Sequence, residues 1–343
     1  MKSFASDNYS GIHNQIIKAI IDANSGHEIS YGEDSYTLET QKLFEQSFGK
    51  VKVLYAFNGT GANVIGLKCC TLPFEAIITS QYSHIVVDEC GAPVQSIGCS
   101  VITLPTTDGK IRPEQIEPYL AQKGNVHHSQ PKVISISQCT ELGTVYTIGE
   151  LKALCDFAHD NGLYVHMDGA RIANAAVALG VSLREATVDY GIDIMSFGGT
   201  KNGMMIGEAV LIFNEKLAEN APFYQKQSAQ LYSKNRFIAA QFGAVLKDEL
   251  WKETARHSNK MARLLSAELS DIKGISITQK TDANGIFAVL PREITPALQE
   301  EFHFYIWDET TNEARLMCSF DTTEEEVFSF AQAIRKATEN ITL

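Results

Sequence analysis

Short apolar segments alternate with helix-like segments through residues 53–213, and this alternation is the strongest constraint on the fold. The apolar segments have the length of buried strands, and the segments between them have helical periodicity or helix-ending glycines such as Gly162. Strands that are separated by helices form a mostly parallel sheet that is covered on both faces. The predicted strands are 53–57, 76–79, 101–104, 133–137, 163–167, 192–197 and 209–213.

The rest of the chain predicts a second, smaller domain. Residues 237–267 have a helical pattern, and several short apolar segments and a last helix at 322–338 follow. A chain of 343 residues is also too long for one minimal core. We therefore expect a large α/β domain at 14–245 and a small α+β domain at 246–343 that is joined by the arm 1–13.

The composition argues against several classes of function. The formal net charge of −12 opposes a nucleic-acid or anionic-membrane partner. No apolar run approaches the roughly 18 residues that a transmembrane helix needs, and the first residues lack the apolar region of a signal peptide. The 7 cysteines show neither a Cys-x-x-Cys pair nor a zinc-binding spacing. We expect a cytoplasmic protein with reduced thiols and no metal site.

Three groups with unusual chemistry lie where predicted strands end. The turn 59–61 (Gly-Thr-Gly) opens a helix, where backbone N–H groups and the positive end of the helix dipole suit a phosphate. Asp168 ends a core strand, Arg171 follows it, and Lys201 comes after the next strand in a glycine-rich turn. A lysine amine in an enclosed site can lose its proton and form a Schiff base. Taken singly, each group has a plainer explanation: a simple turn, an Asp–Arg ion pair and an exposed lysine.

Together, the three groups match the needs of pyridoxal phosphate. The carboxyl ends of strands in a parallel sheet are where ligands bind, and these groups would meet there. The lysine would hold the aldehyde, the aspartate would pair with the pyridine nitrogen, and the turn would hold the phosphate. A protonated ring nitrogen makes the cofactor a better electron sink, which gives the aspartate its role. The small residues around Lys201 would let the cofactor approach the backbone.

Two motifs also resemble a known family. Residues 165–175 (Val-His-Met-Asp-Gly-Ala-Arg-Ile-Ala-Asn-Ala) resemble the His-x-Asp-Gly-Ala-Arg signature of the L-threonine aldolases, which are relatives of the β-eliminating lyases. Residues 196–203 (Ser-Phe-Gly-Gly-Thr-Lys-Asn-Gly) are similar to the lysine motif of a bacterial branch with low-specificity threonine and phenylserine aldolases. The resemblance covers nearly the whole chain and implies an aspartate-aminotransferase-like fold (fold type I) in a homodimer or a dimer of dimers. Further matches are Ser6-Asp-Asn, Tyr31-Gly-Glu-Asp34, Ser83-His84, Thr140-Glu-Leu-Gly-Thr-Val-Tyr146 and Arg315.

The resemblance implies which residues bind the cofactor. Lys201 would carry it, and Asp168 would meet its ring nitrogen. His84 would stack on the ring; taken alone, it is a surface histidine at the start of a helix. The phosphate would be bound by Gly59, Thr60 and Gly61.

The resemblance also implies which residues bind the substrate. The substrate carboxylate or the cofactor's phenolic oxygen would be bound by Arg171, Arg315 and Ser6, with the arginines in fork geometry. His128 matches the histidine that reaches the substrate hydroxyl in relatives, and a solvated loop histidine is the alternative. The residues that would reach the neighbouring subunit's site, unless they are ordinary solvated side chains, are Tyr31, Lys226, Lys234 and Arg236.

The chain departs from many relatives at three places, which leaves the preferred β-substituent of the substrate open. Residues 138–141 read Gln-Cys-Thr-Glu, where many relatives have Glu-Asn-Thr-His. Residues 319–321 read Ser-Phe-Asp, where others have a histidine. The lysine motif also differs from the Ser-Lys-Gly-Leu form of the better-known aldolases.

The implied reaction is the retro-aldol cleavage of L-threonine, L-allo-threonine and similar β-hydroxy-α-amino acids to glycine and an aldehyde. His84 or His128 would remove the β-hydroxyl proton, directly or through water. Another lyase or aminotransferase reaction with the same cofactor, and a non-catalytic cofactor-binding protein, are the alternatives. A dehydrogenase is disfavoured because residues 58–63 lack the G-x-G-x-x-G spacing. The sequence ranks neither threo against erythro substrates, nor acetaldehyde against aromatic aldehydes, nor dimer against tetramer.

Overall fold

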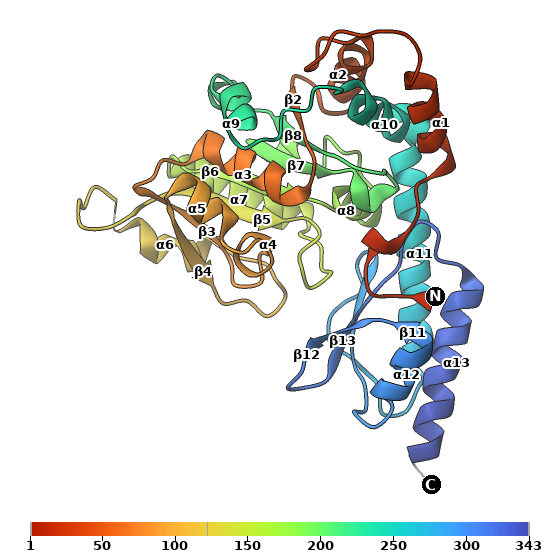
Figure 1. The fold of residues 1–343 in the computed structure, drawn as a ribbon. Coiled ribbons are helices and arrows are strands. Elements are labelled where there is room, and N and C mark those ends of the chain that lie inside the picture. Colours follow the sequence, from red (N-terminus) through yellow and green to blue (C-terminus); the bar gives the residue numbers. More distant parts are fainter. Residues whose placement is uncertain (1, 122, 342–343) are drawn as a thin grey trace.

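The large domain is built on one sheet with the strand order β2-β8-β7-β6-β5-β3-β4 (Figure 1). The computed structural model describes residues 2–121 and 123–341. Every strand pair of this sheet is parallel except those made by β8, which runs antiparallel to β2 and β7. The prediction of a mostly parallel sheet is confirmed. The strands are β2 (Lys52–Ala56), β3 (Glu75–Ser80), β4 (Ser100–Leu104), β5 (Gln130–Ser137), β6 (Tyr164–Gly169), β7 (Ile194–Gly198) and β8 (Glu208–Ile212).

The reversal of β8 follows from the short segment before it. Residues 199–207 join β7 to β8 and contain only one helical turn, Thr200–Asn202. A parallel crossover needs about a dozen residues or more, so this connection returns the chain antiparallel to β7. Lys201 lies in that turn.

Both faces of the sheet are buried, as neighbouring residues of the strands show. Ile77 and Ile78 point to opposite faces, and neither is exposed; Ile194 and Met195 behave in the same way. One face packs against α3 and the other against α7, which is the arrangement that near-continuous apolar strands require. The helices of this domain are α1 (Asn14–Ala23), α2 (Ser35–Phe48), α3 (Gly59–Cys70), α4 (His84–Val87), α5 (Ala92–Ile97), α6 (Pro113–Leu120), α7 (Ile148–Asp160), α8 (Ile172–Leu179), α9 (Ala221–Gln227) and α10 (Arg236–Leu246).

The small domain packs an antiparallel sheet, in the order β12-β13-β10-β9, against long helices (Figure 1). The N-terminal arm joins it, because β1 pairs in parallel with β11 and Phe4 lies in the same core as Phe302 and Phe330. Its elements are β1 (Lys2–Ser3), α11 (Leu250–Ser270), β9 (Ser276–Ile277), β10 (Gly285–Val289), α12 (Thr295–Glu301), β11 (Phe302–His303), β12 (Tyr305–Asp308), β13 (Glu313–Met317) and α13 (Glu324–Ile341).

The helical segment predicted at 237–267 consists of two helices. Asp248 and Glu249 have left-handed φ angles of 53° and 55°, which separate α10 from α11. α11 then passes through both domains, since Trp251 is buried in the core of the large domain and Leu265 in that of the small domain. The boundary between the two domains at 245/246 remains a prediction. Residues 1, 342 and 343, which the prediction assigns to the arm and the small domain, lie outside the described ranges.

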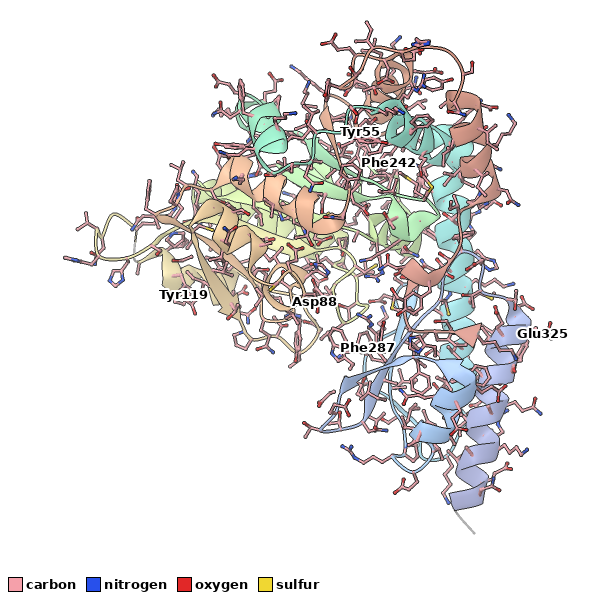
Figure 2. All side chains as sticks on the ribbon, in the orientation of Figure 1. Tyr55, Asp88, Tyr119, Phe242, Phe287 and Glu325 are labelled. Atoms are coloured by element: carbon pink, nitrogen blue, oxygen red, sulfur yellow. The ribbon has the colours of Figure 1, made fainter. Side chains whose placement is uncertain are left out.

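The carboxyl ends of β6 and β7 lie at the junction of the two domains. Arg171 and Lys201, which follow these strands, line one cavity with Phe287 and Arg315 of the small domain. Figure 2 shows Asp88 of the large domain and Phe287 of the small domain on either side of this junction. Within the described residues, no helix combines the length and the apolar composition that crossing a membrane requires.

Candidate active site

The order of the strands brings the predicted cofactor residues together. β6 and β7 are neighbours, with Asp168 opposite Ser196, so the chain that leaves β7 passes close to Asp168. Asp168 and Lys201 border one small cavity together with Gly59 and His84. The structure therefore places these four predicted residues around a single space at the carboxyl edge of the sheet.

The glycines before Lys201 are required by backbone packing. A Cβ atom at Gly198 would lie 2.2 Å from the carbonyl oxygen of Ala170, and one at Gly199 would lie 2.4 Å from that of Gly207. Only glycine permits such an approach of two backbones. The prediction gives these small residues a role in cofactor approach, but the contacts that demand glycine here are between protein segments.

Asp168 is held by two hydrogen-bond donors. The side chain of Asn63 donates to Oδ2 at 2.8 Å, and the N–H of Ala170 donates to Oδ1 at 3.0 Å. The Ser196 hydroxyl donates to Asn63 Oδ1 at 2.8 Å, which turns the Asn63 NH2 group toward Asp168. Burial alone would raise the pKa of Asp168, but the Asn63 hydrogen bond and the charge of Lys201 lower it. The carboxyl is therefore an anion, as the partner of a protonated pyridine must be.

His84 is tied to the same network through Glu89. Its Nδ1 lies 2.7 Å from Oε1 of the buried Glu89, which also accepts from Asn63 at 2.8 Å. The hydrogen bond with Glu89 raises the pKa of His84. Ligand atoms of His84, Glu89 and Asp168 lie within 4.8 Å of one another, a spacing that a cation also fits, but the Asn63 amide already bridges the two carboxylates.

The turn before α3 offers free amides. In the part of the chain that the structure describes, the N–H groups of Gly59 and Thr60 have no hydrogen-bond partner. The N–H of Gly61 donates to Asn58 Oδ1 at 2.8 Å and so caps the helix. The Gln230 side chain covers Gly61, since a Cβ atom there would lie 2.5 Å from Gln230 Cδ. Two of the three predicted amides are thus free for a phosphate at the positive end of α3.

Lys201 shares its cavity with a second carboxyl group, that of Glu208. Burial and then the charge of Arg171 lower the pKa of Lys201, which favours the neutral amine that attacks an aldehyde. Glu208 accepts from the Gly199 N–H at 2.6 Å and so holds the turn that carries Lys201. Burial raises the pKa of Glu208 to about 7. A protonated Glu208 removes one negative charge from the cavity that is predicted to take a phosphate-bearing cofactor.

Three groups of this network are not among the predicted residues. Asn63 lies on α3, Glu89 follows α4, and Glu208 begins β8. At positions 63 and 208 the available signal is a polar residue next to an apolar run that is otherwise buried. At position 89 no local pattern separates this glutamate from a surface residue.

Arg171 binds the N-terminal arm. Its Nε and Nη2 donate to the two carboxylate oxygens of Asp7 at 2.7 and 2.8 Å, which makes a bidentate pair. Asn284 of the small domain also donates to Asp7, at 3.1 Å. Burial would raise the pKa of Asp7, but Arg171 lowers it to about 2. Arg171 is therefore the partner of Asp7, and the plainer explanation of Asp168 as one half of an Asp–Arg ion pair is wrong.

Arg315 has an unused donor. Its Nε is buried and has no hydrogen-bond partner among the described residues. The guanidinium lies over the rings of Tyr305 and Trp307, 5.8 and 5.1 Å from their centroids. An unpaired guanidinium at a cavity wall is a site for an anion. The cavity, of about 470 Å³, is also lined by the predicted residues Ser6, His84, Arg171 and Lys201.

His128 does not lie at this site. It is exposed in the turn before β5, whereas the site lies at the carboxyl end of the parallel sheet. A strand of 8 residues is about 26 Å long, so β5 separates His128 from the cavity. The prediction that His128 reaches the substrate hydroxyl is wrong for a site within one chain.

Tyr31 and the basic loop also lie away from the cavity of their own chain. Tyr31 is exposed, and the Nζ of Lys226 lies 5.4 Å from the centroid of its ring. Arg236 donates to the carbonyl oxygens of Ser25 and Gly26, and Lys234 is exposed. A role for these side chains in catalysis therefore requires a second subunit.

The groups around the small cavity fit pyridoxal phosphate. The Lys201 amine suits the aldehyde, the Asp168 anion suits a protonated ring nitrogen, and the amide of Gly59 suits the phosphate. The two arginines and Ser6 lie in the adjoining larger cavity, which also contains Lys201. A small amino acid that reacts at the lysine would therefore meet both arginines.

Replacing Asp7 by asparagine should destabilise the folded protein by about 3–5 kcal/mol at pH 7, because Arg171 loses its buried partner. The pKa of Asp7 is depressed in the folded state. The stabilisation by its carboxylate is therefore present above the ordinary pKa of 3.8 and is lost as the pH falls toward about 2. Urea denaturation of both proteins measures this effect. The difference between wild type and Asp7→Asn should shrink at pH 3, and equal stability at pH 7 would contradict the argument.

Comparisons with known proteins show the family of this chain. A family model described as beta-eliminating lyase matches residues 3–291. The low-specificity L-threonine aldolase of Pseudomonas aeruginosa is 41% identical over 97% of this chain and 97% of its own length, and a protein of the same name from a further Pseudomonas strain is also 41% identical over the same shares. The structure of Leishmania major threonine aldolase matches with a TM-score of 0.93 at 32% identity, over 98% of this chain and 99% of that one. This match confirms the predicted fold type I architecture with its small C-terminal domain. The chain belongs to the beta-eliminating lyase family, in the group of the low-specificity L-threonine aldolases.

Proposed function

We propose that this protein is a pyridoxal-phosphate-dependent lyase that cleaves L-threonine, L-allo-threonine and similar β-hydroxy-α-amino acids to glycine and an aldehyde. The observation that carries the proposal is the pair of adjoining cavities. The smaller cavity is lined by Lys201 and Asp168, which suit the cofactor. The larger cavity is lined by Arg171 and Arg315, which suit an α-carboxylate. The near-full-length similarity to two low-specificity L-threonine aldolases supports this choice among the reactions of the cofactor.

Lys201, Asp168 and the 59–61 turn would hold the cofactor. Bound there, pyridoxal phosphate supplies an electron sink for the electron pair of a broken bond at Cα. Asp168 would keep a proton on the ring nitrogen, since Asn63 and the Ala170 N–H stabilise its anion. Glu89 fixes the orientation of the His84 ring, which would lie against the cofactor ring.

Arg171 and Arg315 would bind the α-carboxylate of the substrate. Arg315 has a free Nε, and Arg171 has the Nη1 donor that Asp7 leaves unused. A fixed carboxylate determines which bond at Cα stands perpendicular to the cofactor ring and therefore breaks. Phe287 and Trp307, which pack edge to face at 5.6 Å, form an apolar wall of the same cavity.

A panel of substrates tests this function. The holoenzyme is given L-threonine, L-allo-threonine, phenylserine and serine, and the products are identified by mass spectrometry. We expect glycine with acetaldehyde from the two threonine isomers, and glycine with benzaldehyde from phenylserine. An oxo acid as the main product would instead indicate β-elimination or transamination. Cofactor absorbance without any turnover would indicate a non-catalytic protein.

We also propose a homodimer or a dimer of dimers in the cytoplasm. Tyr31 and Lys226 are exposed and in mutual contact outside their own cavity, a position from which they could reach a second subunit's site. Ile29, two residues before Tyr31, is exposed at 64% of its surface, which adds apolar area to this region. The free cysteines agree with a reducing compartment. Sedimentation velocity measures the assembly, and a monomer at micromolar concentration would contradict it.

A further inference from the structure

Glu141 is a carboxyl group of the larger cavity that the roles above leave unassigned. It follows the end of β5 and lines the cavity together with Lys201 and Arg315. Its Oε1 accepts two hydrogen bonds, from the Ser137 hydroxyl at 2.6 Å and from the backbone N–H of His84 at 2.8 Å. These two donors belong to separate segments of the large domain and hold the carboxyl group in one orientation.

The second oxygen of Glu141 is available. Within the described ranges, Oε2 of Glu141 makes no hydrogen bond. It is also not fully buried, unlike Oε2 of Glu89, which is buried without a hydrogen-bond partner. It is therefore open to the cavity. Asp7 and Asp168 differ from it, because both of their oxygens accept hydrogen bonds. Glu141 thus offers free lone pairs where the substrate would lie.

The surroundings of Glu141 favour proton uptake. Burial raises the pKa of Glu141, the Ser137 hydrogen bond opposes this, and the charge of Asp168 raises it further. A carboxylate whose pKa is raised above its ordinary value binds a proton more readily, which suits general-base catalysis. The titratable groups that share or border its cavity are Tyr9, His84, Asp88, Cys139, Asp168, Arg171, Lys201, Glu208, Tyr305 and Arg315.

The other candidate bases are less suited. The Nδ1 of His84 is bound to Glu89, which raises the pKa of the ring and favours its protonated, donating form. His128 lies at the opposite end of β5. Asp88 lines the cavity but is exposed to solvent, so it has no enclosed contact with a bound substrate.

We propose that Glu141 is the general base that removes the β-hydroxyl proton of the substrate, an assignment that rests on the proposed lyase function. Glu141 takes the hydroxyl proton, and the electron pair of that O–H bond forms the C=O bond of the aldehyde while the Cα–Cβ bond breaks. The electron pair of the broken bond stays on Cα until Cα takes up a proton and glycine leaves. Glu141 then releases its proton to solvent.

The Glu141→Gln holoenzyme tests this role with three readouts. The kcat for L-threonine cleavage should fall by about 10²- to 10⁴-fold, the usual contribution of a general base. Exchange of the glycine α-proton with D₂O, followed by NMR, involves no β-hydroxyl group and should stay within about threefold of the wild type. Glycine binding, followed by the visible spectrum of the cofactor, should also be preserved.

Two further variants separate a base from a merely structural residue. Glu141→His retains a base and should keep more cleavage activity than Glu141→Gln. Asp88→Asn should lose less activity than Glu141→Gln, because Asp88 is the competing carboxylate. An equal loss of cleavage and glycine exchange in Glu141→Gln would overturn the assignment, since it would indicate general damage to the site.

The wild-type protein tests the proposed function separately. A wild type that makes no glycine from L-threonine would overturn both the function and the role of Glu141. A glycine-producing wild type with an equally fast Glu141→Gln variant would overturn only the role of Glu141. The acidic limb of the wild-type pH profile should be absent in Glu141→Gln, because a general base loses activity as it becomes protonated.

Discussion

Replacing Lys201 by alanine should abolish covalent attachment of pyridoxal phosphate and lower turnover by about 10⁴-fold or more. In the described part of the chain, no second lysine lines either cavity of the site, so no neighbouring amine replaces it. Burial and the charge of Arg171 lower the pKa of Lys201, which prepares this amine for both nucleophilic attack and proton transfer. Mass spectrometry after borohydride reduction measures the attachment, and glycine release measures turnover.

Lys273→Ala is a matched control for this variant, because Lys273 is an exposed lysine of the small domain. The control should attach the cofactor and turn over as the wild type does. A Lys201→Ala variant that still cleaves threonine at the wild-type rate would exclude Lys201 as the anchor. Loss of activity with the fold intact, as judged by circular dichroism, is the expected result.

The buried strands are the most predictable part of this fold. A strand covered on both faces must be apolar along its whole length, so the segment 192–197 is visible in the sequence and β7 is observed at Ile194–Gly198. The break at Asp248 and Glu249 is not visible, because the residues on both sides keep a helical pattern and neither residue is a glycine.

The site residues that the sequence predicts are those that lie in motifs at the ends of strands. Asp168 and Lys201 can be assigned because Asp168 lies at the end of one apolar strand and Lys201 lies in the glycine-rich turn after the next. The other contacts join distant segments: Asp7 and Arg171 are 164 positions apart, and Asn63 and Asp168 are 105 apart. No local pattern encodes such pairs, so only the fold shows that Asp7 belongs to Arg171.

His128 and Glu141 show which sequence feature predicts whether a residue lies at the cavity. The resemblance to the family selects His128, but this histidine precedes β5 and therefore lies at the amino end of the strand. Glu141 lies four positions beyond Ser137, the last residue of β5, and thus at the carboxyl end. In a parallel sheet the active site forms at the carboxyl ends, so position relative to the strand outweighs the match of a single histidine to relatives.

Replacing Asp168 by asparagine should leave the cofactor attached to Lys201 and lower turnover by about 30- to 5,000-fold. Asparagine has the same shape, but it has no charge to compensate a protonated ring nitrogen. Losing one partner of a buried, hydrogen-bonded charge pair costs about 2–5 kcal/mol, which converts to that range of rates. Asp160→Asn, at an exposed aspartate of α7, is the matched control and should turn over normally.

A modified cofactor separates the charge of Asp168 from its shape. An analogue with a methyl group on the ring nitrogen carries a fixed positive charge that needs no proton. If Asp168 acts by keeping that nitrogen protonated, the analogue should restore part of the turnover of Asp168→Asn. The single oxygen of asparagine can keep only one of the two hydrogen bonds from Asn63 and the Ala170 N–H, because its NH2 group cannot accept a hydrogen bond. Wild-type turnover in Asp168→Asn, or no recovery with the analogue, would show that Asp168 does not act through the charge of the ring.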